Sequence, residues 1–135
     1  MGLAEKRAVK EFQDGAFPGL KKQIDEAAGF DVPLDVNWDS LGVEGLAHLY
    51  ADAFEKVYFI PVIEALKKIC ADDMGKEALK GSLKNIVLSN TEDKSGEAGI
   101  GYEGGTLKID HKPTTNIGDV SLRTNAIVKK LESAL

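Results

Sequence analysis

The stretch from Asp39 to Asp73 carries the longest helical pattern of apolar positions in the chain. It opens with Asp39 and Ser40, which are typical N-cap residues, and apolar side chains then recur at helical period on one stripe. This stripe consists of Leu46, Leu49, Tyr50, Ala53, Phe54, Val57 and Ile60. Beyond Pro61 the apolar positions shift to the opposite side of the predicted helix. Because proline lacks an N–H and crowds the preceding turn, we expect a long central helix kinked at Pro61. The alternative is a straight helix buried on both faces.

Shorter helices are expected on both sides of this stretch. Residues 3–14 form an amphipathic pattern that Gly15 ends, and a second helical pattern runs from Phe17 to Gly29. A further helical turn is expected at 75–80, capped by aspartates. A C-terminal helical stripe from Val120 to Leu135 follows Asp119, which is another N-cap type.

Strict alternation of apolar and polar residues predicts strands elsewhere. It covers Val32 to Trp38, where Pro33 indicates an edge strand or the first residues of a strand, because proline cannot donate to a ladder. Residues 83–90 have the apolar run of a buried strand. Two alternating segments flank Gly104-Gly105, a signal for a tight hairpin. The cross-strand pairs expected from this turn are Tyr102 with Leu107, Ile100 with Ile109, and Ala98 with His111.

The order of elements is helix, helix, strand, long helix, strand, hairpin, helix, which is typical of the α+β class. We therefore expect an antiparallel sheet of about four strands packed on one face by helices. The length of 135 residues is enough for a core without metals or disulfides, and no linker divides the chain. A single α+β domain over residues 1–135 is the expectation.

Charge and cysteine content narrow the cellular setting and the classes of partner. The net charge is −5, and Arg7 and Arg123 are the only arginines, so the basic stripe of a nucleic-acid-binding protein is missing. The single Cys70 cannot form an internal disulfide, which favours a reducing compartment. No apolar run approaches the length of a membrane span. These features predict a cytoplasmic protein with neither a nucleic-acid nor a membrane partner.

One glycine pattern resembles a phosphate-binding loop. Residues 99–104 match the spacing GxGxxG, but a strand rather than a helix follows them, so the context of a dinucleotide site is missing. We expect these glycines to shape the hairpin, and no cofactor is expected.

His48, Asp52 and Glu55 are the first candidate site. Their spacing of i, i+4 and i+7 places them on one face of a helix, where an imidazole and two carboxylates are able to bind a divalent metal or form a catalytic base with its partner. The competing interpretation is a solvated helix face, and the sequence favours no metal.

Further candidates lie in the last third of the chain. His111 ends a predicted strand, where loops often carry function, and Asn116 lies in the polar segment that follows. Tyr102, Asn116 and Arg123 are candidates for binding a ligand, Arg123 through its forked donors. The structural alternatives are a histidine at the rim, a helix cap, and an ion pair from Arg123 to a neighbouring element.

No complete catalytic constellation is present in the sequence. The leading hypothesis is a non-enzymatic binding or protein-interaction domain that holds a partner, or a second copy of itself, at the sheet edge or in a helix–sheet cleft. The alternatives are a small metal-dependent hydrolase using His48, Asp52 and Glu55 with His111, and a small-ligand carrier. Convergence of His48 and His111 on one cleft distinguishes the first alternative from the leading hypothesis.

Overall fold

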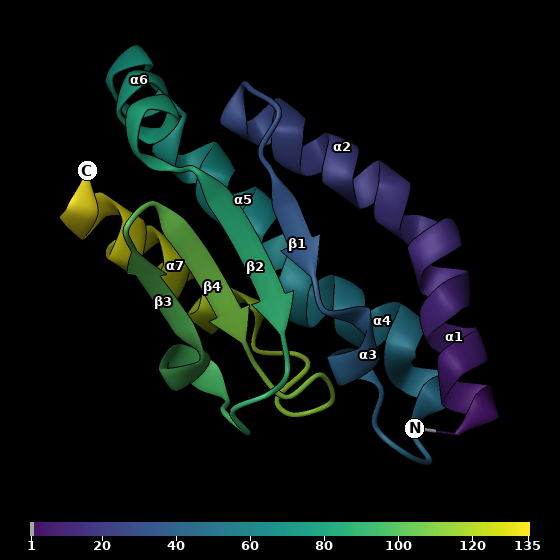
Figure 1. Cartoon of the computed structure of the whole chain (residues 1–135). Helices are drawn as coiled ribbons and strands as arrows, with labels where there is room; N and C mark the ends of the chain where they lie inside the picture. The colour runs from purple at the N-terminus through teal and green to yellow at the C-terminus, as the bar shows by residue number, and fades with distance from the viewer. Residues whose placement is uncertain (1) are drawn as a thin grey trace.

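The computed structural model describes residues 2–135, which form helices and one four-stranded sheet (Figure 1). The strands are β1 (Leu34–Val36), β2 (Asn85–Ser89), β3 (Ile100–Glu103) and β4 (Thr106–Asp110). The α-helices are α1 (Leu3–Asp14), α2 (Ala16–Ala28), α3 (Trp38–Leu41), α4 (Tyr50–Phe54), α5 (Ile60–Ile69), α6 (Asp73–Ser82) and α7 (Val120–Ala134). Two 3-10 turns, η1 (Ala47–Leu49) and η3 (Gly96–Gly99), and a π-helical turn, η2 (Glu55–Phe59), complete the chain. The α+β class is confirmed.

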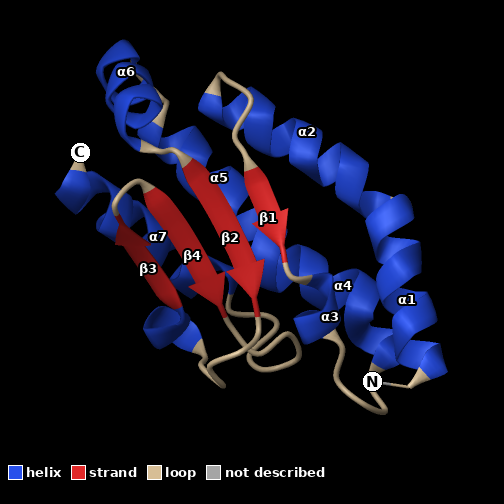
Figure 2. Cartoon of the chain, in the orientation of Figure 1, coloured by secondary structure: helices blue, strands red, loops and turns tan. Residues whose placement is uncertain are grey.

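The sheet is mixed, so the expectation of a purely antiparallel sheet is wrong. Its order is β1-β2-β4-β3, with β1, β2 and β4 parallel and only β3 antiparallel to its neighbour (Figure 2). Helices α3 to α6 return the chain before β2, which allows a parallel pair. After β2 the chain passes to the outer edge and forms β3, and the hairpin then inserts β4 between β3 and β2. Strand patterns give the faces of a sheet but not this order.

The hairpin has the predicted register. Tyr102 pairs with Leu107 and Ile100 with Ile109, while Ala98 lies in η3 and not in the ladder. The loop residues Gly104 and Gly105 have φ values of 60° and 87°, which only glycine adopts readily at two successive positions.

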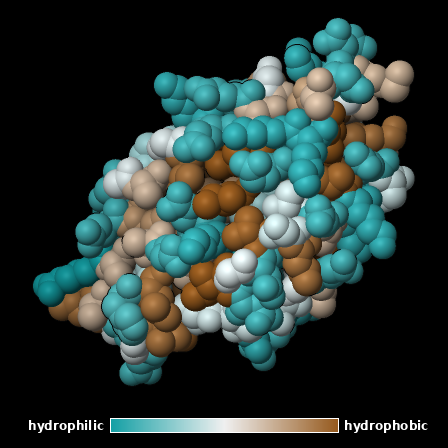
Figure 3. All heavy atoms as spheres, turned by 180° about the vertical axis from the view of Figure 1, so that it is seen from behind, coloured by the Kyte–Doolittle hydropathy of each residue, from teal (hydrophilic) through white to brown (hydrophobic). Residues whose placement is uncertain are grey.

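Helices cover one face of the sheet. Alternate residues of β2 and β4, Ile86, Leu88, Leu107 and Ile109, are fully buried against the helical layer, whereas Lys108 on the other face is exposed. Figure 2 shows α5 and α7 behind the strands and the face of β2 and β4 toward the viewer uncovered. From behind, the helical layer shows apolar surface between polar side chains (Figure 3).

The long central pattern forms several elements, and a kink at Pro61 is not confirmed. Asp39 and Ser40 lie inside the short α3, and the helical path begins only at η1. From there α4, η2 and α5 follow one another, with Pro61 in the first turn of α5. The N–H of Ile60 donates to the carbonyl of Glu55, five residues earlier, so a π-helical turn precedes the proline.

Aromatic side chains join the N-terminal helices to the centre. The ring of Phe12 meets Phe54 edge-on, with centroids 5.3 Å apart, and Phe17 meets Trp38 edge-on at 5.0 Å. Trp38 was expected to end the first strand, but it begins α3, where it packs into this aromatic cluster. Within residues 2–135, no helix combines the length and the apolar character needed to cross a membrane.

Two glycines of α6 predict opposite effects of alanine substitution. A Cβ on Gly75 would lie 1.7 Å from the carbonyl oxygen of Ile69, because α6 begins directly against the end of α5; a Cβ on Gly81 would contact nothing. We expect Gly75→Ala to lower the free energy of unfolding by roughly 1–3 kcal/mol or more. Gly81→Ala removes helix-destabilising flexibility and should raise it by about 0.5–1 kcal/mol. Urea denaturation of both variants measures this, and equal effects would contradict the packing at the α5–α6 junction.

Candidate functional site

Asp110, at the end of β4, is buried and fully hydrogen-bonded. One carboxylate oxygen accepts the N–H groups of Thr91 and Glu92, each at 2.9 Å, and the other accepts the hydroxyls of Ser89 at 2.6 Å and Thr91 at 2.7 Å. Burial raises the pKa of this carboxyl, but the bonds from Ser89, Thr91 and Glu92 outweigh it and lower the pKa to about 2. Asp110 is therefore ionised at neutral pH and holds the loop after β2 as a carboxylate.

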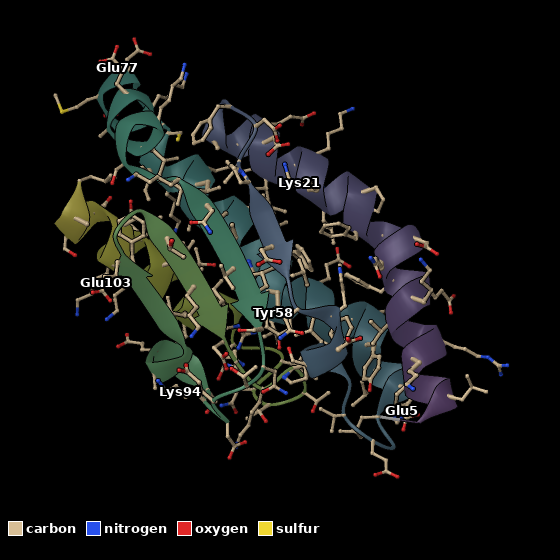
Figure 4. All side chains as sticks on the ribbon, viewed as in Figure 1. Glu5, Lys21, Tyr58, Glu77, Lys94 and Glu103 are labelled. Atoms are coloured by element: carbon tan, nitrogen blue, oxygen red, sulfur yellow. The ribbon has the colours of Figure 1, made fainter. Side chains whose placement is uncertain are left out.

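His111 is fully buried, with both ring nitrogens occupied by the backbone. Nε2 accepts the N–H of Gly96 at 2.8 Å, so the proton lies on Nδ1, which donates to the carbonyl of Lys112 at 2.6 Å. The Tyr58 hydroxyl donates to the His111 carbonyl at 2.5 Å. Figure 4 shows Tyr58 near the lower ends of the strands. Burial lowers the pKa of His111; the hydrogen bond to the Lys112 carbonyl opposes this change, and the nearby cations Arg123 and Lys112 add to it.

Arg123 lies inside the protein and binds backbone carbonyls. Nη1 donates to Asn116 at 2.7 Å, and Nη2 donates to Ile117 at 2.7 Å and to Lys56 at 3.2 Å. Its Nε has no hydrogen-bond partner within the described chain. Burial lowers the pKa of the guanidinium, while Asp119 opposes that change. A ligand-binding role of Arg123 would require these carbonyl bonds to break. Asn116 contributes its carbonyl and has a left-handed φ of 53°.

His48, Asp52 and Glu55 do not lie on one face of a regular α-helix, because they belong to three different helical elements. His48 lies in the 3-10 turn η1 and is exposed, while Asp52 in α4 forms an ion pair with Lys56 at 3.0 Å. Glu55 begins the π-helical turn. Among residues 2–135, no group of three or more His, Cys, Asp or Glu side chains is arranged to hold a metal ion. A catalytic role for these residues stays a prediction.

His48 and His111 do not share a cavity. His48 borders a depression of about 280 Å³ between the first two helices and the start of α4, with Phe12 and Tyr50 among its lining residues. His111 lies under η3, on the side of Gly96 and Gly99. The cleft that would have brought both histidines together is therefore not formed.

Tyr102 lies in a groove along the outer strand β3. The groove has a volume of about 500 Å³ and is formed by β3, β4 and α7. Its lining residues are Gly101, Tyr102, Glu103, Thr106, Lys108 and Lys130. The hydroxyl of Tyr102 is 2.6 Å from that of Ser82 at the end of α6, a hydrogen bond that fixes the ring. Figure 4 shows Glu103 at the outer side of the sheet.

The outer side of β3 offers unpaired backbone groups. In the described sheet β4 is its only neighbour, so alternate residues direct their N–H and C=O outward. The two-residue turn makes Glu103 and Thr106 a hydrogen-bonded pair, and the alternation then places the N–H and C=O of Tyr102 on the outer side. A Cβ on Gly101 would have no heavy atom within 4 Å, so the strand is also open on its polar face.

Sequence reasoning found one groove residue, Tyr102, and missed Glu103, Lys108 and Lys130. The hairpin register places Glu103 and Lys108 on the same face of the sheet, so these two residues could have been predicted from the sequence. Lys130 could not, because its contribution to the groove depends on how α7 packs. Tyr58, Ser89 and Thr91 were also missed, because their role depends on the order of strands in the sheet.

Comparison with known proteins gives no match: no family model, curated protein or solved structure is significantly similar to this chain. The function must therefore be inferred from the geometry.

The buried neutral His111 predicts acid sensitivity. Its pKa is lowered in the folded state, so as the pH falls below the ordinary value of about 6.5 the unfolded chain binds a proton first, and the free energy of unfolding decreases. We expect this decrease between about pH 7 and 5 in the natural protein and in His48→Gln, which alters the exposed histidine. His111→Gln should lose it, even if that variant is less stable overall. Denaturant titrations across the pH range measure the slope, and an unchanged slope in His111→Gln would contradict the assignment.

Proposed function

We propose that this protein is a small interaction domain that binds an extended polypeptide strand along the outer edge of β3. The observation that carries the proposal is the unpaired edge of β3 beside a groove of about 500 Å³. Addition of a strand to such an edge is a common mode of peptide recognition: the main chain supplies affinity, and flanking side chains supply specificity. Lys108 and Lys130 flank the strand from β4 and α7, respectively.

A comparison of the two sheet edges supports this choice. Proteins protect exposed edges by short strands, prolines, bulges or a covering element. β1 has three residues and follows Pro33, and the N–H of Val32 is bonded to Asp25 of α2 at 2.9 Å. β3 contains no proline, and its uninterrupted pairing with β4 shows that it has no bulge. Figure 1 shows α2 on the side of β1, whereas β3 forms the opposite margin.

The buried polar residues support binding rather than catalysis. Asp110 and His111 are almost completely inaccessible, at 1% and 0% exposure, and their polar atoms bond to the protein's own loops. Catalytic acids and bases have to reach a substrate. The free, buried Cys70 supports a reducing compartment such as the cytoplasm as the setting for this interaction.

A crosslinking experiment tests the edge directly. An amino acid with a small alkyl diazirine at position 101 should, on irradiation in an extract of the native cells, join this chain to an extended segment of a bound protein. Position 101 tolerates a side chain because the space there is open. The matched control is the same amino acid at position 19, an exposed glycine of α2 with equally open surroundings.

The expected result is an adduct at position 101 and not at position 19, with the crosslinked peptide identified by mass spectrometry as an extended segment. A chain that gives no adduct at position 101, or equal adducts at both positions, would show that the β3 edge is not an interaction site.

A further inference from the structure

We infer that the strand bound at this edge is β3 of a second copy of the chain, paired antiparallel about a two-fold axis at Tyr102. This inference rests on the proposed function and names the partner of that site. The two sheets would join into one continuous eight-stranded sheet, in which the same edge contributes from both copies.

The backbone geometry suits this arrangement. Tyr102 has its N–H and C=O directed outward, so Tyr102 of one copy and Tyr102 of the other would exchange two N–H···O=C bonds as a reciprocal antiparallel pair. The N–H of Ile100 is already bonded to the carbonyl of Glu97 in η3, so the new ladder is limited in that direction. Only a short ladder forms, which is typical of a transient interface rather than an obligate dimer.

Charge complementarity selects the register centred on Tyr102. In this register Glu103 lies opposite Gly101 of the second copy, and Gly101 pairs with Lys108 within its own hairpin. With strands about 4.8 Å apart, Glu103 and the second copy's Lys108 are roughly 10 Å apart between Cα atoms. Gly101 places no side chain between them, so the two long side chains are able to meet. The two-fold axis gives two such ion pairs in the dimer.

Lys108 has one acidic neighbour within its own chain, and this does not prevent the pairing. Its Nζ is 3.6 Å from a Glu92 carboxylate oxygen, and both side chains are nearly half exposed. Such a solvent-exposed pair is weak, so Lys108 remains able to interact with an incoming carboxylate.

Sedimentation equilibrium of the purified chain, from micromolar to millimolar concentration, tests the inference. We expect reversible dimerisation. Glu103→Lys places a lysine beside Lys108 of the other copy and should weaken the dimer roughly tenfold, and Lys108→Glu should do the same. The double variant Glu103→Lys/Lys108→Glu restores opposite charges and should recover most of the affinity. Glu26→Lys on α2, which lies on the side of β1 (Figure 1), makes the same charge change at an exposed site and should leave the affinity unchanged.

The outcomes separate this inference from the proposed function. A chain that stays monomeric, or a dimer that Glu103→Lys does not weaken, overturns self-pairing; so does a double variant that is folded by circular dichroism but fails to regain affinity. If position 101 then crosslinks to a strand of another protein, the proposed function stands without self-pairing. If position 101 gives no adduct either, both fail.

Discussion

The missing N–H of Pro61 is the constraint on which the arrangement of the helical layer depends. In the π-helical turn the N–H of Ile60 bonds to Glu55, so the next carbonyl, that of Lys56, would need the absent N–H of Pro61. Arg123 of α7 donates to this carbonyl instead. The same guanidinium bonds to the carbonyls of Asn116 and Ile117. One side chain therefore joins the central helix, the last loop and the start of α7, and α7 supports β3 and β4 from behind.

The other buried polar residues mainly hold a different segment, the one between β2 and β3. Asp110 holds the segment after β2, His111 holds Gly96, and the hydroxyl of Tyr58 connects the π-helical turn to the end of β4. These groups satisfy backbone atoms that a mixed sheet leaves at its strand ends. Two of the candidate site residues, His111 and Arg123, therefore bind the protein's own backbone.

Local patterns predicted local structure well. Alternation around Gly104-Gly105 gave the hairpin register, and Pro33 indicated an edge strand, as β1 is. The parallel pairing of β2 was not predicted, because an apolar run indicates a buried strand but does not specify which strands lie beside it or in which direction they run. The π-helical turn and the 3-10 turn that contains His48 were not predicted either. The spacing argument assumes a regular α-helix, and both turns depart from one. The groove was found only at Tyr102, since Lys130 reaches it through tertiary packing.

In the proposed mode of association, the outer edge of β3 is open in the monomer and becomes paired in the dimer. Hydrogen exchange resolved to single residues, in dilute and in concentrated protein, tests it most directly. We expect the Tyr102 amide to exchange rapidly in dilute solution and to become protected as the concentration rises, while the amides of Leu88 and Ile109 in the central strands stay protected in both. A Tyr102 amide that exchanges at the same rate at both concentrations, in a protein that dimerises, would contradict it.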